Sequence, residues 1–342
     1  MKKITIKDVA REAGVSVTLV SFVMNAKVNE DGKLDCPVNA ETAARVLEVA
    51  KRLGYRRNAA AASLRSGRSN TIAVITTDIA NKFFAGISRY IEDRAYEYGY
   101  TVLFGSSDEH PDKLAAVMDT VLAYNVDGVI VAPVAGGEKA IARAIDSHVP
   151  IVLLDRDIEG LDCVGKVLLD DREAGKMATD HLLDAGYKKI EMISYSLGIS
   201  SISEREAGYK AAMVARGLLG NVNIQRIEYG DQESDLNAVI KDAIDRGVEA
   251  FFLPTYTISA LVLAAMNDLE VKSPESLAIV AFDQSDVYRL YTPSIAHMVQ
   301  PLQSLGEKSV ELLHNMIENI PGETTIILKP ELVDGGSVRK LQ

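Results

Sequence analysis

The chain of 342 residues has only two cysteines, Cys36 and Cys163, and no Cys-x-x-Cys motif. This spacing excludes a disulfide framework. No apolar run approaches the ~18 residues that a transmembrane helix needs. The segment from Met1 to Asp8 lacks the apolar stretch of a secretory signal. These absences predict a cytoplasmic protein with no membrane segment.

Signatures of catalysis are also missing from the sequence. There is no His-Glu-x-x-His motif, no Gly-x-Ser-x-Gly nucleophile elbow and no phosphate-binding loop. The Asp170-Asp171 pair offers acid chemistry, but neighbouring like charges in one loop are usually solvated. We therefore expect no catalytic activity, no metal and no cofactor. Five histidines are scattered without metal-ligand spacing: His110, His148, His181, His297 and His314.

Charge is distributed unevenly along the chain. The formal net charge is −11, yet residues 1–70 contain 13 Lys and Arg against 7 Asp and Glu. A basic N-terminal part joined to an acidic remainder is typical of a nucleic-acid-binding module attached to another domain. Chance variation in the charge of a small domain is the alternative.

Residues 5–25 have the pattern of two short helices around a tight turn. Thr5 and Ser16 are suitable N-caps, and Gly14 suits a sharp turn between helices. The predicted outer face of the second helix is uncharged and carries groups that can contact base edges in the major groove. A helical hairpin with a polar face is the alternative. The outer-face residues are Val17, Thr18, Ser21, Phe22 and Asn25.

A third helix is predicted after its cap Asn39, with apolar residues at helical spacing from Ala43 to Leu53 and Gly54 at its end. Seven Lys and Arg but one acid lie between residues 45 and 68, which favours phosphate binding, although a solvated basic helix has the same composition. The Ala-rich stretch 58–66 is too short for a stable isolated helix. It suggests a linker that folds on DNA and inserts Leu64 into a minor-groove step, or simply a flexible linker.

From residue 71 onwards, short apolar segments alternate with helical periodicity, which predicts parallel α/β sheets. About 270 residues exceed one comfortable open sheet, so two lobes are expected. The predicted strands are 72–76, 101–105, 129–132, 151–154, 190–194, 251–253 and 279–282.

Polar and aromatic residues follow several of these strands, where parallel sheets bind ligands. Carboxylates, a guanidinium and phenyl rings facing one cleft suit a polyhydroxylated ligand. Any one of them alone is better explained as an exposed charge. They are Asp78, Asn81, Phe83 and Phe84, then Asp155 and Arg156, then Asp283, together with Glu204 and Arg205 at a helix start.

Several ordered motifs resemble the lactose-repressor (LacI/GalR) family of bacterial transcription regulators, through nearly the whole chain to about Gly335. In the acidic remainder the landmarks are Asp155-Arg156, Asp170-Asp171, Ala174-Gly175, Glu204-Arg205, Gly208-Tyr209, Ala281-Phe282-Asp283 and Gln300-Pro301. In the basic part they are Thr5-Ile6-Lys7-Asp8-Val9-Ala10, Ala13-Gly14-Val15-Ser16, Val20-Ser21, Asn25, Val38-Asn39-Ala40-Glu41-Thr42, Leu53-Gly54-Tyr55, Asn58, Ala61 and Leu64-Arg65.

The resemblance implies an all-α helix-turn-helix DNA-binding domain at 1–57, a hinge helix at 58–69 and a two-lobed α/β domain, similar to periplasmic binding proteins, at 70–342. It implies a homodimer on an inverted-repeat DNA operator and a small-molecule effector, a carbohydrate or a derivative, in the cleft. Val17, Thr18 and Phe22 match base-reading positions. The DNA-binding residues are then Thr5, Ser16, Val17, Thr18, Ser21, Phe22, Asn25, Asn58, Ala61, Leu64 and Arg65. The effector-binding residues are Asp78, Phe83, Asp155, Arg205, Tyr256 and Asp283.

The sequence also departs from the family pattern. Phe22 stands where arginine is common, which implies base reading with fewer hydrogen bonds, and the loop 26–37 is longer than usual. Tyr256-Thr257 replaces a usual Asn-Asp pair, which puts sugar recognition in question, although Tyr256 is able to stack on a ring. A secreted solute-binding protein is the rival class for the acidic part, and the attached basic part argues against it. The sequence predicts a transcriptional repressor that is not an enzyme.

Overall fold

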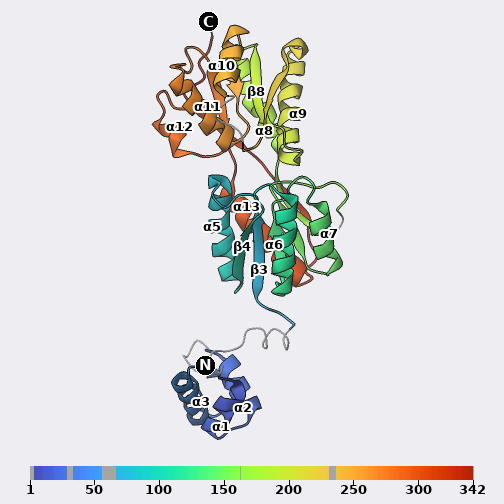
Figure 1. Ribbon diagram of the computed structural model, residues 1–342, viewed down its shortest axis with the longest axis vertical. Coiled ribbons are helices and arrows are strands. Elements are labelled where there is room, and N and C mark those ends of the chain that lie inside the picture. Colours follow the sequence, from blue (N-terminus) through green and yellow to red (C-terminus); the bar gives the residue numbers. More distant parts are fainter. Residues whose placement is uncertain (1–3, 29–33, 56–66, 162, 231–235, 342) are drawn as a thin grey trace. The chain divides into compact units, whose positions relative to one another are not determined.

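The computed structural model describes residues 4–28, 34–55, 67–161, 163–230 and 236–341. The chain divides into two compact units, Met1–Ser69 and Asn70–Gln342 (Figure 1). The hinge residues expected to bind DNA, namely Asn58, Ala61, Leu64 and Arg65, lie outside the described residues.

The described residues of the first unit form three helices, α1 (Ile6–Ala13), α2 (Val17–Asn25) and α3 (Ala40–Leu53). The predicted caps are confirmed. The Thr5 backbone N–H donates to Asp8 Oδ2 over 3.0 Å, and Ser16 Oγ accepts from the Leu19 N–H over 3.2 Å. Gly14 follows α1 with φ 66°, a left-handed conformation in which a side chain is strained. A tight turn between α1 and α2 follows.

A small apolar core joins these three helices. Val9, Val20 and Val46, one from each helix, are all completely buried. The long loop after α2 contains an antiparallel pair of two-residue strands, β1 (Lys27–Val28) and β2 (Leu34–Asp35), which the sequence had left without a structure. The core explains why one face of α2 is unavailable to any partner.

In the second unit, the residues that the structure describes form two six-stranded sheets, and each sheet with its helices forms one lobe. The order is β13-β7-β6-β5-β3-β4 in the first lobe and β14-β12-β11-β10-β8-β9 in the second. All neighbouring strands are parallel except β12 and β14. The first-lobe strands are β3 (Thr71–Thr76), β4 (Thr101–Ser106), β5 (Gly128–Val131), β6 (Ile151–Leu154), β7 (Gly165–Leu169) and β13 (Thr325–Leu328). The second-lobe strands are β8 (Ile190–Tyr195), β9 (Asn223–Ile227), β10 (Ala250–Phe252), β11 (Ala278–Phe282), β12 (Ala296–Val299) and β14 (Glu331–Val333).

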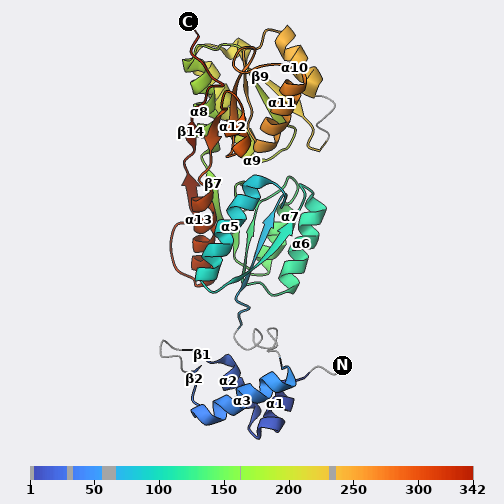
Figure 2. The ribbon, with the colours of Figure 1, turned by 90° about the vertical axis from the view of Figure 1, so that its left-hand side faces the viewer.

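Helices cover both faces of each sheet, which explains why the central strands are apolar throughout. In the first lobe, α5 (Lys82–Glu97) and α13 (Leu302–Ile317) pack on one face, opposite α6 (Pro111–Ala123) and α7 (Glu138–Asp146) (Figure 2). In the second lobe, α8 and α9 pack opposite α10 and α11, with α12 nearby. Their bounds are α8 (Asp171–Asp184), α9 (Ser200–Ala215), α10 (Leu236–Asp245), α11 (Tyr256–Asp268) and α12 (Asp286–Leu290).

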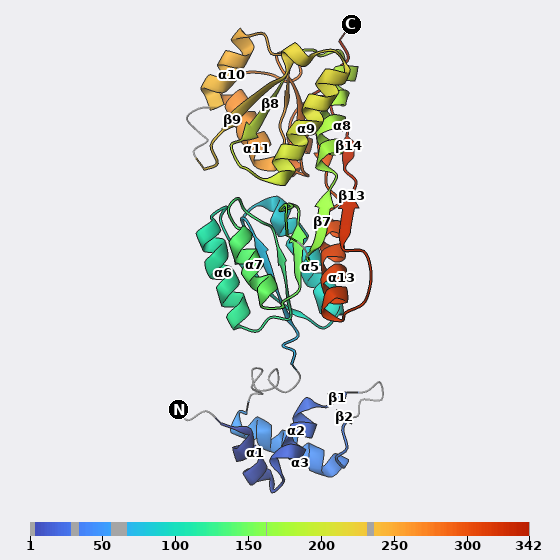
Figure 3. The same ribbon diagram turned by 90° about the vertical axis from the view of Figure 1, so that its right-hand side faces the viewer.

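The chain crosses between the lobes three times, after β7, after β12 and after β13 (Figure 3). Each lobe is therefore built from segments far apart in the sequence. The strand predicted at 101–105 is present as β4, but it is not buried, since β4 forms the edge of its sheet and Phe104 is 41% exposed.

Candidate DNA-reading helix and interlobe cavity

The outer face of α2 exposes Val17, Thr18 and Phe22, with Phe22 49% accessible to solvent. Ser21 was expected on the same face and is instead buried. It follows Val20 directly on the side that packs against the core. The Asn25 Nδ2 also covers it, donating to the Ser21 carbonyl over 2.6 Å and to its Oγ over 3.0 Å. Ser21 and the Asn25 amide therefore bind each other.

The hydroxyl groups of Thr5 and Ser16, two further predicted DNA-binding residues, form hydrogen bonds within their own helix starts. Thr5 Oγ1 donates to Asp8 Oδ2 over 2.7 Å, while Ser16 Oγ caps α2. Both lie at the first turn of a helix, where backbone N–H groups point outwards and an anion is favoured. This placement is compatible with a neighbouring phosphate.

In the second unit, side chains from both lobes line one cavity of about 60 Å³. The lining residues follow the carboxyl ends of strands in each sheet, as sequence analysis expected of a ligand site. From the first lobe they are Thr77, Asn81, Phe83, Phe84, Glu109, Asp155 and Arg156. From the second lobe and its crossing they are Tyr195, Leu197, Ile199, Ser201, Ile202, Arg205, Tyr229, Thr255, Thr257, Asp283 and Gln300.

Asp155 and Asp283 occupy equivalent places in the two lobes. Asp155 directly follows β6 and Asp283 directly follows β11, each with a positive φ, 69° and 66° respectively. Both side chains are buried, at 6% and 8% exposure. Aspartate tolerates this left-handed conformation better than most residues, although it costs free energy. The chain thus presents one carboxylate from each lobe to the cavity.

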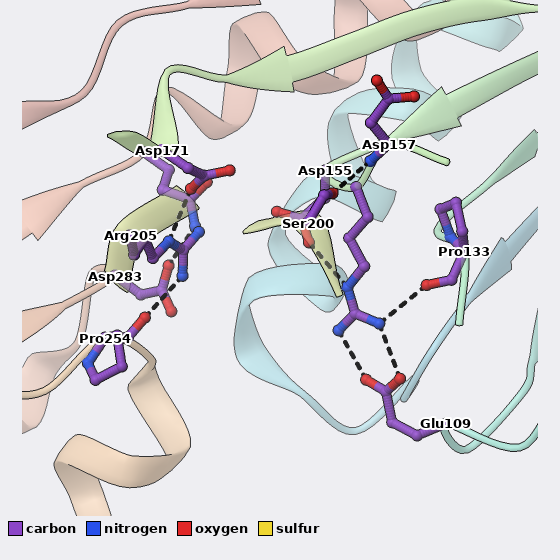
Figure 4. Close-up of polar contacts among 11 residues, drawn as sticks. Glu109, Pro133, Asp155, Asp157, Asp171, Ser200, Arg205, Pro254 and Asp283 are labelled. Atoms are coloured by element: carbon purple, nitrogen blue, oxygen red, sulfur yellow. Dashed lines mark hydrogen bonds and ion pairs between the residues drawn. The ribbon is translucent and has the colours of Figure 1, made fainter. Parts of the chain in front are cut away.

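Arg205 is held rigidly inside α9. Its Nε donates to Asp171 Oδ1 over 2.7 Å, and its Nη1 donates to the Pro254 carbonyl over 2.7 Å (Figure 4). The guanidinium also stacks over the Phe282 ring, with Cζ 3.8 Å from the ring centroid. The guanidinium therefore has a fixed direction before any ligand binds.

The other charged groups of the cavity are also paired. Arg156 forms a bidentate pair with Glu109, with both N···O distances between 2.7 and 2.8 Å (Figure 4). Asp283 accepts from Gln300 Nε2 over 2.7 Å and from the Tyr256 backbone N–H over 3.0 Å. These bonds fix the polar walls of the cavity.

Burial shifts the pKa of three carboxyl groups upwards. It raises the pKa of Asp155 despite Arg156 and Arg205, and that of Asp283 despite Arg205 and Gln300. It raises the pKa of Asp171 to about 7, against the attraction of Arg205. The cause in each case is that a charge is costly in a desolvated site.

The structure brings Phe83, Asp155, Arg205 and Asp283 together, but it places Asp78 and Tyr256 outside the lining. Asp78 instead bends back within its own turn, where its Oδ1 accepts from the Ala80 N–H over 2.8 Å. The Tyr256 ring lies 5.5 Å from Lys82 Nζ, and its neighbours Thr255 and Thr257 face the cavity instead.

Glu204, expected near Arg205, pairs on the surface with Arg172 Nε over 2.7 Å. Glu109 was not predicted from the sequence as a site residue. It follows β4 and therefore obeys the same strand-end rule that identified Asp155. Gln300 was recognised only as part of a family motif, and its position directly after β12 is the signal that identifies it as a site residue.

The described part of the chain contains no group of three or more His, Cys, Asp or Glu residues placed to hold a metal ion. None of the described helices is long and apolar enough to span a membrane.

The first unit has three described helices and an exposed, uncharged face on α2. The second has two lobes with a polar cavity between them. Together they define the class of ligand-binding transcriptional regulators. Comparison with known proteins agrees. Residues 5–58 match the model described as bacterial regulatory proteins, lacI family, and residues 72–322 match a periplasmic binding protein domain. The chain belongs to the lacI family of bacterial regulatory proteins and is a DNA-binding transcriptional regulator.

Among its relatives, catabolite control protein A of Priestia megaterium is 32% identical over 335 residues, which cover 97% of this chain and 98% of that protein. The Lac repressor dimer, solved bound to operator and the anti-inducer ONPF, has a TM-score of 0.82 at 20% identity and covers 99% of this chain and 100% of its own. A regulator from Alkaliphilus metalliredigens complexed with D-xylulofuranose has a TM-score of 0.69 at 24% identity, over 79% of this chain and 99% of its own. The expected fold, helix-turn-helix followed by two α/β lobes, is confirmed.

Proposed function

We propose that the protein is a homodimeric, cytoplasmic repressor without catalytic activity, which binds an inverted-repeat operator. Residues 1–57 form the DNA-binding domain, 58–69 the hinge and 70–342 the effector-binding and dimerisation domain. The exposed row Val17, Thr18 and Phe22 on α2 supports this reading of the first domain, because it offers methyl, hydroxyl and phenyl groups to base edges. Asn25 remains exposed beside them.

The remaining DNA contacts follow the family pattern. Thr5 and Ser16 lie at helix starts suited to phosphate contacts. In the hinge, Asn58, Ala61, Leu64 and Arg65 fold on the duplex, and Leu64 enters the minor groove. Ser21 supports the helix from its buried side.

We infer further that a small-molecule effector, a carbohydrate or a derivative, occupies the interlobe cavity. The observation that carries this proposal is the convergence of Arg205, Asp155 and Asp283, from both lobes, on one buried cavity. Phe83 from α5 provides an apolar surface for a sugar ring. The neighbour solved with D-xylulofuranose supports the ligand class.

The small size of the cavity implies that the two lobes move when a ligand binds. Its volume of about 60 Å³ lies far below the roughly 300–1,000 Å³ of common ligand sites. An effector therefore enters when the lobes separate about the three crossings, and it alters the lobe angle in the bound state. A ligand that favours one angle by several kcal/mol shifts operator occupancy substantially.

The test uses the purified full-length protein and duplexes from the region upstream of its own coding sequence. Sedimentation measures the oligomeric state, and footprinting locates the protected bases. The proposal expects a dimer that protects an inverted repeat. A monomer, or protection without sequence preference, contradicts it.

A further inference from the structure

The walls of the interlobe cavity hold more negative than positive charge. Glu109, Asp155 and Asp283 line it with Arg156 and Arg205, and Asp171 pairs with Arg205 through a bond of 2.7 Å. Four carboxylates thus face two guanidinium groups, and burial of their side chains limits screening by water. Glu109 pairs with Arg156, and Asp171 pairs with Arg205, which leaves Asp155 and Asp283 without an arginine of their own.

These two remaining carboxylates differ in their partners. Asp283 is held by two neutral donors, the Gln300 amide and a backbone N–H. The nearest cation that pairs with Asp155 is Arg156 Nε, at 3.5 Å, a distance too long for a strong hydrogen bond. The guanidinium of that arginine is directed instead at Glu109 and the Pro133 carbonyl, over 2.7 to 3.0 Å. Asp155 is therefore a buried carboxyl group whose ionised form is only weakly compensated.

A second acceptor in the cavity wall lacks a donor. The side chain of Gln300 is 3% exposed, and its Oε1 has no hydrogen-bond partner among the residues that the structure describes. The Nε2 donates to Asp283, which fixes the orientation of the amide. An unpaired buried acceptor is costly, so Gln300 Oε1 is suited to accept a hydrogen bond from a ligand.

The adjoining cavity is also lined by more acidic than basic side chains, although Asp157 pairs with Lys166 and Glu204 pairs with Arg172. It has a volume of about 390 Å³ and shares Arg156 and Ile199 with the first. Its other charged lining residues are all acidic: Glu138, Asp157, Glu159 and Glu204. Within this adjoining cavity, Arg156 is the one basic residue among the lining residues that the structure describes.

We propose that the effector carries a protonated amine, as in an amino sugar or amino polyol, and that its ammonium group donates to the Asp155 carboxylate. This inference rests on the proposed function of the cavity and narrows it to a cationic ligand. The ammonium offsets the excess negative charge, and hydroxyls of the same ligand donate to Gln300 Oε1. A sugar phosphate is disfavoured, because its charge would face Asp155 and Asp283 at low dielectric.

The experiment compares three forms of one sugar skeleton by thermal unfolding of the full-length protein at neutral pH. Glucose, galactose and mannose are each tested as parent sugar, 2-amino sugar and 6-phosphate. At about 100 times its Kd, one or more of the amines should raise the Tm by about 5 °C, and more than its parent or phosphate. Asp155→Asn should lower the affinity for that amine at least thirtyfold, which is about the loss expected when a buried charge is left unpaired.

Asp119→Asn is the matched control, because it removes one exposed carboxylate, paired with Arg143, away from the cavity. It should retain the amine response. Greater stabilisation by a parent sugar or a phosphate, or no shift with any amine, overturns the proposal. Operator binding without ligand is measured in parallel. A protein that binds amines but no operator contradicts the proposed function alone, whereas operator binding without an amine response contradicts this inference alone.

Discussion

Gly175 of α8 lies directly against the backbone of Arg205 in α9. A Cβ atom at position 175 would lie 2.1 Å from the Arg205 carbonyl oxygen, and one at Gly208 would lie 2.1 Å from the Arg172 carbonyl oxygen. The two helices therefore cross at a distance that only glycine permits on both sides. This crossing places the Arg205 guanidinium within hydrogen-bond reach of Asp171, one turn before Gly175.

Gly175→Ala should accordingly separate α8 from α9 and displace Arg205. We expect a loss of about 1–3 kcal/mol in the free energy of unfolding, typical of overpacking, together with weaker effector binding. Gly220→Ala is the control, since a Cβ there meets no atom within 4 Å. Urea unfolding measures both variants. Equal stability of the Gly175→Ala variant and wild type would show that the helices have room to adjust.

Arg205→Ala should abolish the response to effector while operator affinity without effector stays within about twofold of wild type. The guanidinium faces the cavity and lies in the second unit, so the DNA-reading face is untouched. Arg172→Ala provides the control, because that arginine lies on the surface and pairs with Glu204. Fluorescence anisotropy with labelled operator measures both properties. An unchanged response would remove Arg205 from the binding site.

The raised pKa of Asp171 predicts how stability depends on pH. The folded protein holds this proton up to about pH 7, whereas the unfolded chain releases it near pH 3.8. Between these values the folded state binds more protons, so the free energy of unfolding falls as pH rises and levels off above about pH 7. Asp155 and Asp283 contribute in the same direction.

Asp171→Asn should make this decline shallower, by at most about 1.4 kcal/mol per pH unit, because one fewer group titrates. Urea unfolding at several pH values from 4 to 8 measures the slope, and Asp119→Asn should retain the wild-type slope. Identical slopes in Asp171→Asn and wild type would show that Asp171 is ionised throughout that range.

Phe22→Ala should lower affinity for the operator about tenfold and leave binding to unrelated duplexes nearly unchanged, because phosphate contacts do not involve this ring. Leu47→Ala is the matched control, since Leu47 on α3 is also an exposed apolar side chain, at 40% exposure. Competition titrations with operator and random duplexes separate the two kinds of binding. A parallel loss on both duplexes would mean that Phe22 stabilises the domain instead of reading bases.

Periodicity and strand-end position were sufficient to predict much of the second unit. The apolar runs at 151–154 and 279–282 are central strands covered on both faces, so their composition alone reveals them. β7 and β13 were missed because buried and partly exposed residues alternate along them, as at a sheet margin. Asp155 and Asp283 were predicted because each follows such a central strand.

The directions in which side chains point could not be predicted from the sequence. Ser21 and Phe22 are neighbours on α2, yet one is buried beneath Asn25 and the other is exposed, since a small rotation of the helix decides which faces the core. Tyr256 and Thr257 differ for the same reason at the start of α11. Ion pairs such as Arg156–Glu109 join residues from separate loops, so no local sequence pattern predicts them.

The central claim is that the basic first unit binds duplex DNA, and that a ligand in the cavity of the second unit controls the affinity of this binding. Anisotropy of a labelled upstream duplex, titrated with the full-length protein with and without a cavity ligand, tests it most directly. The account predicts saturable binding that weakens steeply with added salt despite the net charge of −11, and a change in affinity of at least about tenfold on adding ligand. Failure to bind any duplex from its own locus, with and without candidate ligands, would contradict it.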